Sequence, residues 1–323
     1  MDSLPTILVP SGDALCETLR LSNLFLESKG VFLKINSEDS IECPSGSLSI
    51  APVALTPGIF YKECFKDAVN LQTSMNLLYY KVSNDDSFLK EVEFNTICIS
   101  LSGLTALVSE FHRYLNERTS YEGLISNCKI KNSQLPENSS FTSFTDGLAS
   151  AFFAYGNQSS AGIGTSMFVE RYISDPKLAK AITDSFAELL PLDESPLGRS
   201  AYEKAMLKYD DYVLKPQREC GGSNTYGIEI PILLKNLSLE QQKAFILMRL
   251  INAPKFDYLF LKNGKVQKIN SISELGIYGI WLSDGDKIII NNEAGHLLRT
   301  KPSDSKEAGI STGFTVIDSP LLI

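Results

Sequence analysis

The chain has 323 residues, of which 43% are hydrophobic and 21% charged, with a net charge of −8 and a pI near 5.0. These values are typical of a globular protein with a full core and predict two domains or subdomains. The acidic balance argues against nucleic-acid binding, which usually requires a basic surface. No run approaches ~18 apolar residues, and residues 1–16 lack a signal-peptide pattern, so we expect a cytoplasmic protein that does not bind membranes.

Cysteine and histidine usage narrows the chemistry further. The six cysteines are scattered without CxxC spacing, which predicts reduced and mostly buried thiols. Only two histidines are present, His112 and His296. A zinc site or a histidine-activated nucleophile is therefore not expected.

The first half of the chain alternates between helical and strand patterns. Leu15, Leu19 and Phe25 recur at helical spacing, and Lys29-Gly30 gives a stop signal after them. A small and polar segment at 157–164 is the expected boundary between a region 1–160 and a region 161–323. The predicted elements are helices at 13–28, 61–82, 104–116 and 144–154, a strand at 91–100 and a polar loop at 129–143.

The second half predicts one more helix, at 178–190, and then mainly strands, at 209–214, 226–230 and 244–251. Ser238 and Gln241 form a capping box. The turns Asn263-Gly264 and Asp284-Gly285 are hairpin signals, so the last third should be an antiparallel meander. The predicted fold class is α+β, with helices covering antiparallel sheets.

The segment 215–224 holds two cations, a carboxylate and two adjacent glycines between two predicted strands. Gly221 and Gly222 would let backbone amides approach phosphate oxygens, with Lys215 and Arg218 at the base of the loop. Glu219 offers a hard oxygen ligand for Mg²⁺. The pattern is neither a Walker A loop nor a Rossmann fingerprint, and by itself it also fits an ordinary glycine-containing hairpin.

Four further strings accompany this loop: residues 91–100, 272–279 (Ile-Ser-Glu-Leu-Gly-Ile-Tyr-Gly), 295–301 (Gly-His-Leu-Leu-Arg-Thr-Lys) and 309–313. In this order they closely resemble the eukaryotic-type glutathione synthetases, which are ATP-grasp ligases. The resemblance is near-continuous from about residue 175 to 323 and patchier from about 30 to 155. It implies an ATP-grasp-type fold with a glycine-rich lid loop.

The implied reaction uses ATP and Mg²⁺ to phosphorylate the carboxylate of γ-glutamylcysteine, and glycine then displaces the acyl phosphate. The family pattern also implies a dimer, either a homodimer or a heterodimer with a full-length relative. A peptide bond does not form from free acid and amine in water without activation, so such a site must neutralise triphosphate charge and exclude water.

The resemblance assigns a role to each matching residue. Arg218 and Arg299 would be catalytic, Arg218 on the transferring phosphoryl group and Arg299 on the dipeptide. Further substrate contacts would come from Ser100, Ile310 and Ser311. The Mg²⁺ ligands would be Glu93, Asn95 and Glu219, although without the resemblance these residues also fit a solvated strand and an exposed loop. The nucleotide contacts would be Lys215, Gln217, Glu219, Cys220, Gly221, Gly222, Ser223, Asn224, Thr225, Tyr226, Met248, Ile251, Glu274 and Lys301.

Two blocks of the family pattern are missing, near residues 87–89 and between 155 and 167. The second would carry most of the dipeptide and glycine site and a second phosphate lysine. Cys220 also stands where the family has a glycine, which restricts φ at that position. Three alternatives follow: an active ligase, a non-catalytic nucleotide-binding or regulatory relative that pairs with an intact paralogue, or an incomplete product of a synthetase gene.

Overall fold

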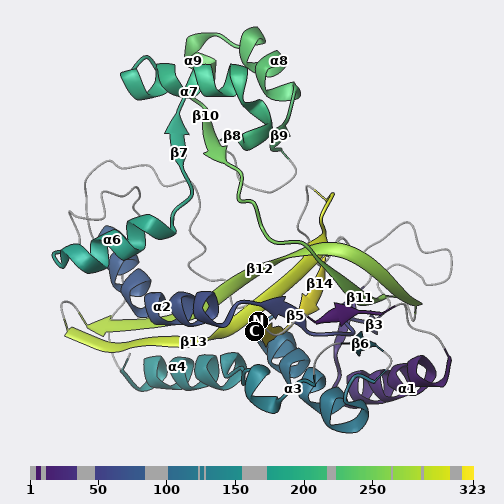
Figure 1. The fold of residues 1–323 in the computed structure, drawn as a ribbon. Coiled ribbons are helices and arrows are strands. Elements are labelled where there is room, and N and C mark those ends of the chain that lie inside the picture. Colours follow the sequence, from purple (N-terminus) through teal and green to yellow (C-terminus); the bar gives the residue numbers. More distant parts are fainter. Residues whose placement is uncertain are drawn as a thin grey trace. The chain divides into compact units, whose positions relative to one another are not determined.

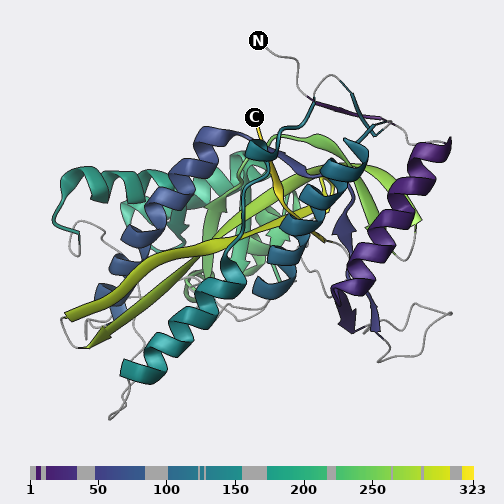
Figure 2. The same cartoon turned by 90° about the horizontal axis from the view of Figure 1, so that it is seen from below.

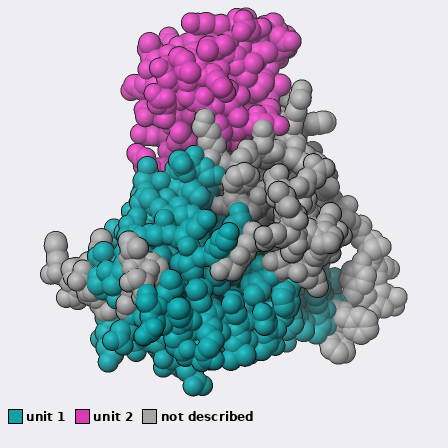
Figure 3. Space-filling view, turned by 90° about the vertical axis from the view of Figure 1, so that its right-hand side faces the viewer, with its two compact units in different colours: residues 1–89, 94–167, 254–323 teal, residues 90–93, 168–253 magenta. Residues whose placement is uncertain are grey.

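The computed structural model describes residues 5–8, 12–34, 48–83, 101–122, 124–126, 129–154, 173–216, 223–262, 265–284, 287–305 and 315–323. The chain divides into two compact units, coloured separately in Figure 3. Unit 1 comprises residues 1–89, 94–167 and 254–323, and unit 2 comprises residues 90–93 and 168–253. Each has its own hydrophobic core. The boundary expected at 157–164, between a region 1–160 with the metal-ligand strand and a nucleotide-binding region 161–323, lies outside the described residues and stays a prediction.

The described elements of both units are labelled in Figure 1. Those of unit 1 are β1 (Thr6–Ile7), α1 (Gly12–Ser28), β2 (Phe32–Lys34), β3 (Leu48–Ile50), β4 (Val53–Ala54), β5 (Gly58–Phe60), α2 (Lys62–Ser83), α3 (Ser102–Thr119), β6 (Ile125–Ser126), η1 (Asn132–Gln134), α4 (Ser140–Ala154), β11 (Phe256–Lys262), β12 (Lys265–Asp284), β13 (Lys287–Pro302), β14 (Val316–Asp318) and β15 (Pro320–Leu322). Those of unit 2 are α6 (Pro176–Ser185), β7 (Leu189–Pro191), α7 (Pro196–Leu207), η2 (Tyr209–Asp211), β8 (Tyr212–Pro216), β9 (Thr225–Tyr226), α8 (Glu229–Asn236), α9 (Leu239–Gln242) and β10 (Phe245–Arg249).

The main sheet of unit 1 is a closed barrel in the order β11-β12-β13-β14-β4. Both predicted hairpins are confirmed, because Lys262 pairs with Lys265 and Asp284 pairs with Lys287 across the two turns. The antiparallel meander β11-β12-β13-β14 is also confirmed. The pairings of β14 with β4 and of β15 with β5 are parallel, in addition to the predicted antiparallel sheets.

The half of the β12–β13 hairpin that includes Tyr278 and Trp281, toward the end of β12, is covered on both faces by helices. Tyr80 of α2 stacks on Trp281 at 4.7 Å between ring centroids, whereas Phe144 of α4 meets Tyr278 edge-on at 5.3 Å. Side chains alternate along a strand, so these two aromatic residues of β12 point to opposite faces. Figures 1 and 2 show α2 and α4 on opposite sides of the hairpin accordingly.

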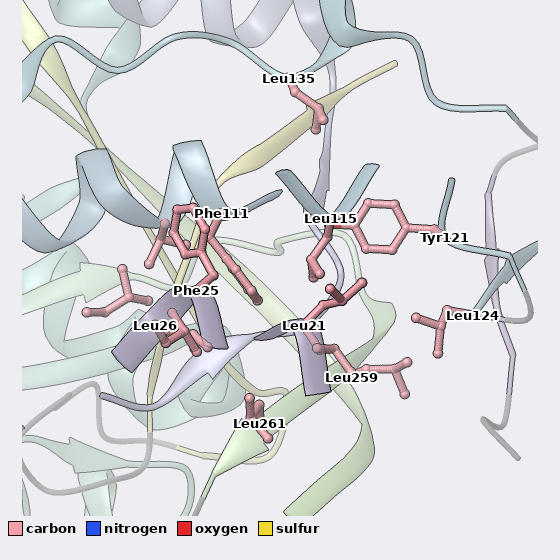
Figure 4. Packing of buried hydrophobic residues seen from close by; sticks show 14 of the residues in the cluster. Leu21, Phe25, Leu26, Phe111, Leu115, Tyr121, Leu124, Leu135, Leu259 and Leu261 are labelled. Carbon is pink, nitrogen blue, oxygen red and sulfur yellow. The ribbon is translucent and has the colours of Figure 1, made fainter. Parts of the chain in front are cut away.

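The larger core of unit 1 packs α1 and α3 against the barrel (Figure 4). Leu21, Phe25 and Leu26 of α1 face Phe111 and Leu115 of α3, and Leu259 and Leu261 of β11 lie beneath them. This spacing in α1 is the i, i+4, i+5 pattern of one helical face, which is why the predicted helix at 13–28 is confirmed.

Unit 2 is a four-stranded antiparallel sheet in the order β7-β10-β8-β9. One face forms a core with α7 and α8, in which Leu190, Leu214, Leu234 and Leu247 are buried. Helix α7 begins at Pro196 after Ser195, whose hydroxyl accepts a hydrogen bond from the Gly198 amide at 3.0 Å. The predicted capping box of Ser238 and Gln241 is confirmed at α9.

Three boundary predictions in unit 2 are wrong. The helix expected to reach residue 190 ends at Ser185, because Leu190 pairs with Leu247 of β10 and is buried in the sheet core. The strand expected at 226–230 stops at Tyr226, since Gly227 adopts φ +56° and turns the chain into α8. Residues 209–211 form a 3₁₀ turn before β8 begins.

Two predictions in unit 1 also need correction. Helix α4 begins at Ser140 rather than at Phe144, because the Asn138 side chain accepts a hydrogen bond from the Ser140 amide at 3.2 Å. Cys16 and Cys64 are free, as expected, but both are exposed rather than buried. The strand predicted at 91–100 lies outside the described residues.

Candidate functional site

A cluster of three charged side chains lies on the paired strands β12 and β13. Glu274 is directly opposite Arg299, and Lys301 is opposite Ile272. Positions opposite each other share a face of the sheet, as do positions two residues apart. The Glu274 carboxylate accepts from Arg299 Nη2 at 3.0 Å, and its other oxygen lies 2.9 Å from Lys301 Nζ. One carboxylate therefore bridges two cations.

The charges of this cluster do not cancel. Arg299 and Lys301 carry two positive charges against the single negative charge of Glu274. A guanidinium and an ammonium together present eight N–H donors, whereas a carboxylate accepts at about four lone-pair positions. The Lys301 side chain is only 11% exposed, and Arg299 is 39% exposed. The cluster is thus suited to hold an anion such as a phosphate or a second carboxylate.

Three predicted nucleotide contacts lie on one face of the unit 2 sheet. Tyr226 of β9 and Met248 of β10 both pair with Val213 of β8. The side chains of Tyr226, Val213 and Met248 therefore form a row across the three strands. Lys215 is two residues further along β8 and shares that face. The intervening Leu214 points into the core with α7 and α8. Lys215, Tyr226 and Met248 are therefore on the face opposite to that core.

The remaining predicted residues of unit 2 are less clearly grouped. Thr225 pairs with Leu214, so its side chain points to the core-facing side of the sheet. Ile251 lies beyond the end of β10 and is 75% exposed. Ser223 is exposed and Asn224 is half-buried, both just before β9.

Other predicted site residues lie outside the described part of the chain: Glu93, Asn95, Ser100, Gln217, Arg218, Glu219, Cys220, Gly221, Gly222, Ile310 and Ser311. Among the residues that the structure does describe, no three histidine, cysteine or acidic side chains are grouped so as to hold a metal ion. The predicted Mg²⁺ ligand set therefore stays a prediction.

A pocket of about 670 Å³ opens along α3 and the start of α4. Its lining consists of Leu101 at the N-cap of α3, one face of α3 itself, Asn138, and Phe141 and Thr142 of α4; the α3 residues are Ser102, Gly103, Leu104, Ala106, Leu107, Glu110 and Arg113. Neither the charged cluster nor the row on β8–β10 contributes to its lining. Within the described segments, no helix is long and apolar enough to cross a membrane.

The buried acid Asp318 was not predicted from the sequence. Asp318 is fully buried in β14, next to strand β13 of the charged cluster. The available signal was an aspartate inside the apolar run 314–323, since Asp is almost never fully buried without a partner.

The fold is a mixed α/β arrangement with antiparallel sheets, and two of its paired strands carry the charged cluster. The sequence matches the family described as "Eukaryotic glutathione synthase, ATP binding domain" over residues 18–92 and 89–322. The chain belongs to this eukaryotic glutathione synthase family.

Curated relatives match about half of the chain. It is 38% identical over 159 residues to the glutathione synthetase large chain of Schizosaccharomyces pombe, covering 49% of this chain and 32% of that protein. It is 36% identical over 156 residues to glutathione synthetase of Dictyostelium discoideum, covering 48% and 33%. The chain thus matches about a third of the length of these relatives.

Among solved structures, the chain is similar to a glutathione synthetase-like effector, GSS30, from Globodera pallida in its apo form. The TM-score is 0.68 at 16% identity, and the superposition covers 98% of this chain and 100% of that one. At this identity the similarity shows a shared fold.

Proposed function

We propose that this chain is an ATP-dependent ligase of the ATP-grasp type that joins γ-glutamylcysteine and glycine. The observation that carries the proposal is the cluster of three residues with family counterparts, in which Arg299 and Lys301 both lie within hydrogen-bonding distance of Glu274. Glu274 and Lys301 would contact ATP. Arg299 would hold the carboxylate of the dipeptide, for which a guanidinium has the matching fork geometry.

Within unit 2, the residues with family counterparts that would contact the nucleotide are Lys215, Tyr226 and Met248, which share one face of its sheet. An ammonium, an aromatic ring and a thioether suit phosphate, ribose and adenine, respectively. The loop 217–225 would cover the phosphates as a glycine-rich lid, with Arg218 on the transferring group. Ile251 would complete the adenine edge.

Mg²⁺ would be held by Glu93, Asn95 and Glu219, which offer the hard oxygen ligands that this ion prefers. When bound, the ion would neutralise part of the triphosphate charge. Arg299, Lys301 and Glu274 together carry only one net positive charge, so a further cation near the phosphates fits the electrostatics of the site.

In the proposed reaction, a carboxylate oxygen of γ-glutamylcysteine attacks the γ-phosphorus of ATP, and ADP leaves. The glycine amine then attacks the acyl carbon, the new C–N bond replaces the C–O bond to phosphate, and inorganic phosphate leaves with loss of one amine proton. Ser100, Ile310 and Ser311 would contact the substrate. We further propose a cytoplasmic location and a homodimer or a heterodimer with a full-length relative.

The test measures binding and turnover separately. Mass spectrometry would detect glutathione and matching ADP after incubation with Mg·ATP, γ-glutamylcysteine and glycine, and both should be lost in Glu219→Gln. Calorimetry should show that Lys301→Met weakens ATP binding at least about tenfold, because a charged hydrogen bond is lost. Lys268→Met is the matched control: Lys268 also lies on β12 but forms an ion pair with Asp257 of β11, at 3.1 Å.

The second candidate function is a non-catalytic nucleotide-binding or regulatory relative. It is favoured by the match to only about a third of the length of each curated relative. Stoichiometric ATP binding without any glutathione would support it over the ligase. Genomic sequence at the junctions near residues 87 and 156 would reveal whether coding segments were skipped.

A further inference from the structure

A chain of hydroxyl groups lies behind the charged cluster, on the other face of the same two strands. Thr300 lies between Arg299 and Lys301, and Ser273 precedes Glu274. Because side chains alternate along a strand, both hydroxyls point away from the charged face. Ser273 Oγ and Thr300 Oγ1 are 2.9 Å apart and hydrogen-bonded across the strand pair. This bond connects the two backbone segments that carry all three charged residues.

The hydroxyl pair ends on Asp318. Thr300 Oγ1 donates to Asp318 Oδ2 at 2.7 Å, while Oδ1 accepts from the amides of Ser319 at 2.7 Å and Gly58 at 3.1 Å. Asp318 is fully buried, and burial raises its pKa to about 7 although these hydrogen bonds lower it. Burying a carboxylate is costly unless donors surround it. Here three donors from three segments converge on it.

No charged partner offsets this carboxylate within the described residues. His112 Nδ1 lies 4.0 Å from Asp318 Oδ1, but burial lowers the His112 pKa to about 4, so the ring is neutral near pH 7. Its Nε2 donates to the Ala54 carbonyl at 2.8 Å, and its Nδ1 accepts from Ser319 Oγ at 2.7 Å. The network therefore runs from α3 through β14 to β13 and β12.

The Gly58 amide can reach Asp318 because residue 58 has no side chain. A Cβ on Gly58 would lie 2.7 Å from Asp318 Oδ2 and 2.8 Å from Leu298 Cδ2. These distances are too short for any side chain larger than hydrogen. Glycine at position 58 is what allows the amide to reach the buried carboxylate.

We propose that Asp318 is a positioning residue for the anion-binding cluster. Through Thr300 and Ser273 it holds β13 against β12, so that Arg299 and Lys301 both keep their contact with Glu274. This inference rests on the proposed function, since the cluster's binding of ATP and dipeptide is itself proposed. If Asp318 only stabilised the barrel as a whole, loss of its contact with Thr300 would not change residues 272–275 and 298–302 more than other residues of the barrel.

The test compares Thr300→Val, which keeps the volume and removes the hydroxyl, with the conservative Thr300→Ser. Thr105→Val is the matched control, because buried Thr105 also donates one hydrogen bond, to the His296 carbonyl at 3.2 Å. Hydrogen exchange of the full chain should speed up at residues 272–275 and 298–302 about tenfold in Thr300→Val, with recovery in Thr300→Ser. Thr105→Val should leave these amides within about twofold of wild type.

Calorimetry with Mg·ATP provides the second readout. Thr300→Val should raise the Kd about tenfold at unchanged stoichiometry, whereas simple loss of folded protein would lower the stoichiometry at unchanged Kd. Unchanged exchange at the cluster, or an unchanged Kd in Thr300→Val, would overturn the inference. Absence of ATP binding by the wild type would instead overturn the proposed function, and the exchange data alone would then decide the positioning role.

Discussion

Substitution of His296 by leucine should make the protein less sensitive to acid. His296 is buried beside Phe65, with ring centroids 5.1 Å apart, and its Nε2 has no hydrogen-bond partner among the described residues. Burial, and secondarily the charge of Arg113, lower the His296 pKa from 6.5 to about 4. The unfolded chain therefore binds a proton at this site before the folded protein does. Stability from this group is present above pH 6.5 and is lost as the pH falls toward 4.

The magnitude follows from the two pKa values. The full shift corresponds to about 3 kcal/mol, of which about 1 kcal/mol is lost by pH 5.5 and between about 2 and 3 kcal/mol by pH 4.5. Leucine has a similar volume and does not titrate. The wild type should therefore lose this much more stability than His296→Leu between pH 7.5 and 4.5. Removing the unpaired Nε2 should also stabilise the variant by about 1 kcal/mol at pH 7.5.

Urea unfolding followed by Trp281 fluorescence gives the free energy of unfolding of unit 1. Trp281 is the only tryptophan and lies on β12, in the same unit as His296. His112 remains in both proteins, so its own acid sensitivity cancels in the comparison. Parallel pH curves for wild type and His296→Leu would refute the reasoning, because they would mean that the His296 pKa is not lowered by folding.

Two matched pairs of substitutions test packing. In urea unfolding, Leu26→Ala should destabilise unit 1 by about 2–5 kcal/mol, because Leu26 is fully buried. Leu24→Ala in the same helix should cost under about 0.5 kcal/mol, because the Leu24 side chain is 55% exposed. Equal costs would contradict the described core. Gly58→Ala should lower stability by about 1–3 kcal/mol through its clash with Asp318, while Gly103→Ala, whose nearest contact would be an ordinary 3.6 Å, should be near neutral in thermal unfolding. A tolerated Gly58→Ala would show that the Asp318 carboxylate is not held at this position.

Local signals in the sequence predicted elements well where periodicity and turn chemistry agreed. Examples are the face of α1 that bears Leu21 and Phe25, and the hairpin formed by β11 and β12. They failed where a partner distant in sequence decided the outcome. Residues 186–190 continue a helical pattern, but pairing with β10 draws Leu190 into a strand. Propensity over a few residues is a weak preference that a buried pairing overrides.

The charged cluster likewise has features that local sequence indicated and one feature that only the pairing of strands decided. The strings that carry Glu274, Arg299 and Lys301, together with the other matching strings, indicated the family from the sequence, and the resemblance then gave Glu274 and Lys301 a nucleotide role and Arg299 a dipeptide role. That one carboxylate bridges both cations depends on the register of β12 and β13, which changes at two irregularities, between Ile277 and Gly279 and between Leu282 and Ser283.

The sequence by itself determined the family, the hairpins and the residue types of the site, because motifs, turn residues and alternation act over short distances. Only the tertiary structure decided that Thr300, Gly58 and Ser319 converge on Asp318. Gly58 and Asp318 are 260 positions apart. No local pattern encodes such a contact, because it exists only after β5, β13 and β14 have assembled and excluded water from the carboxylate.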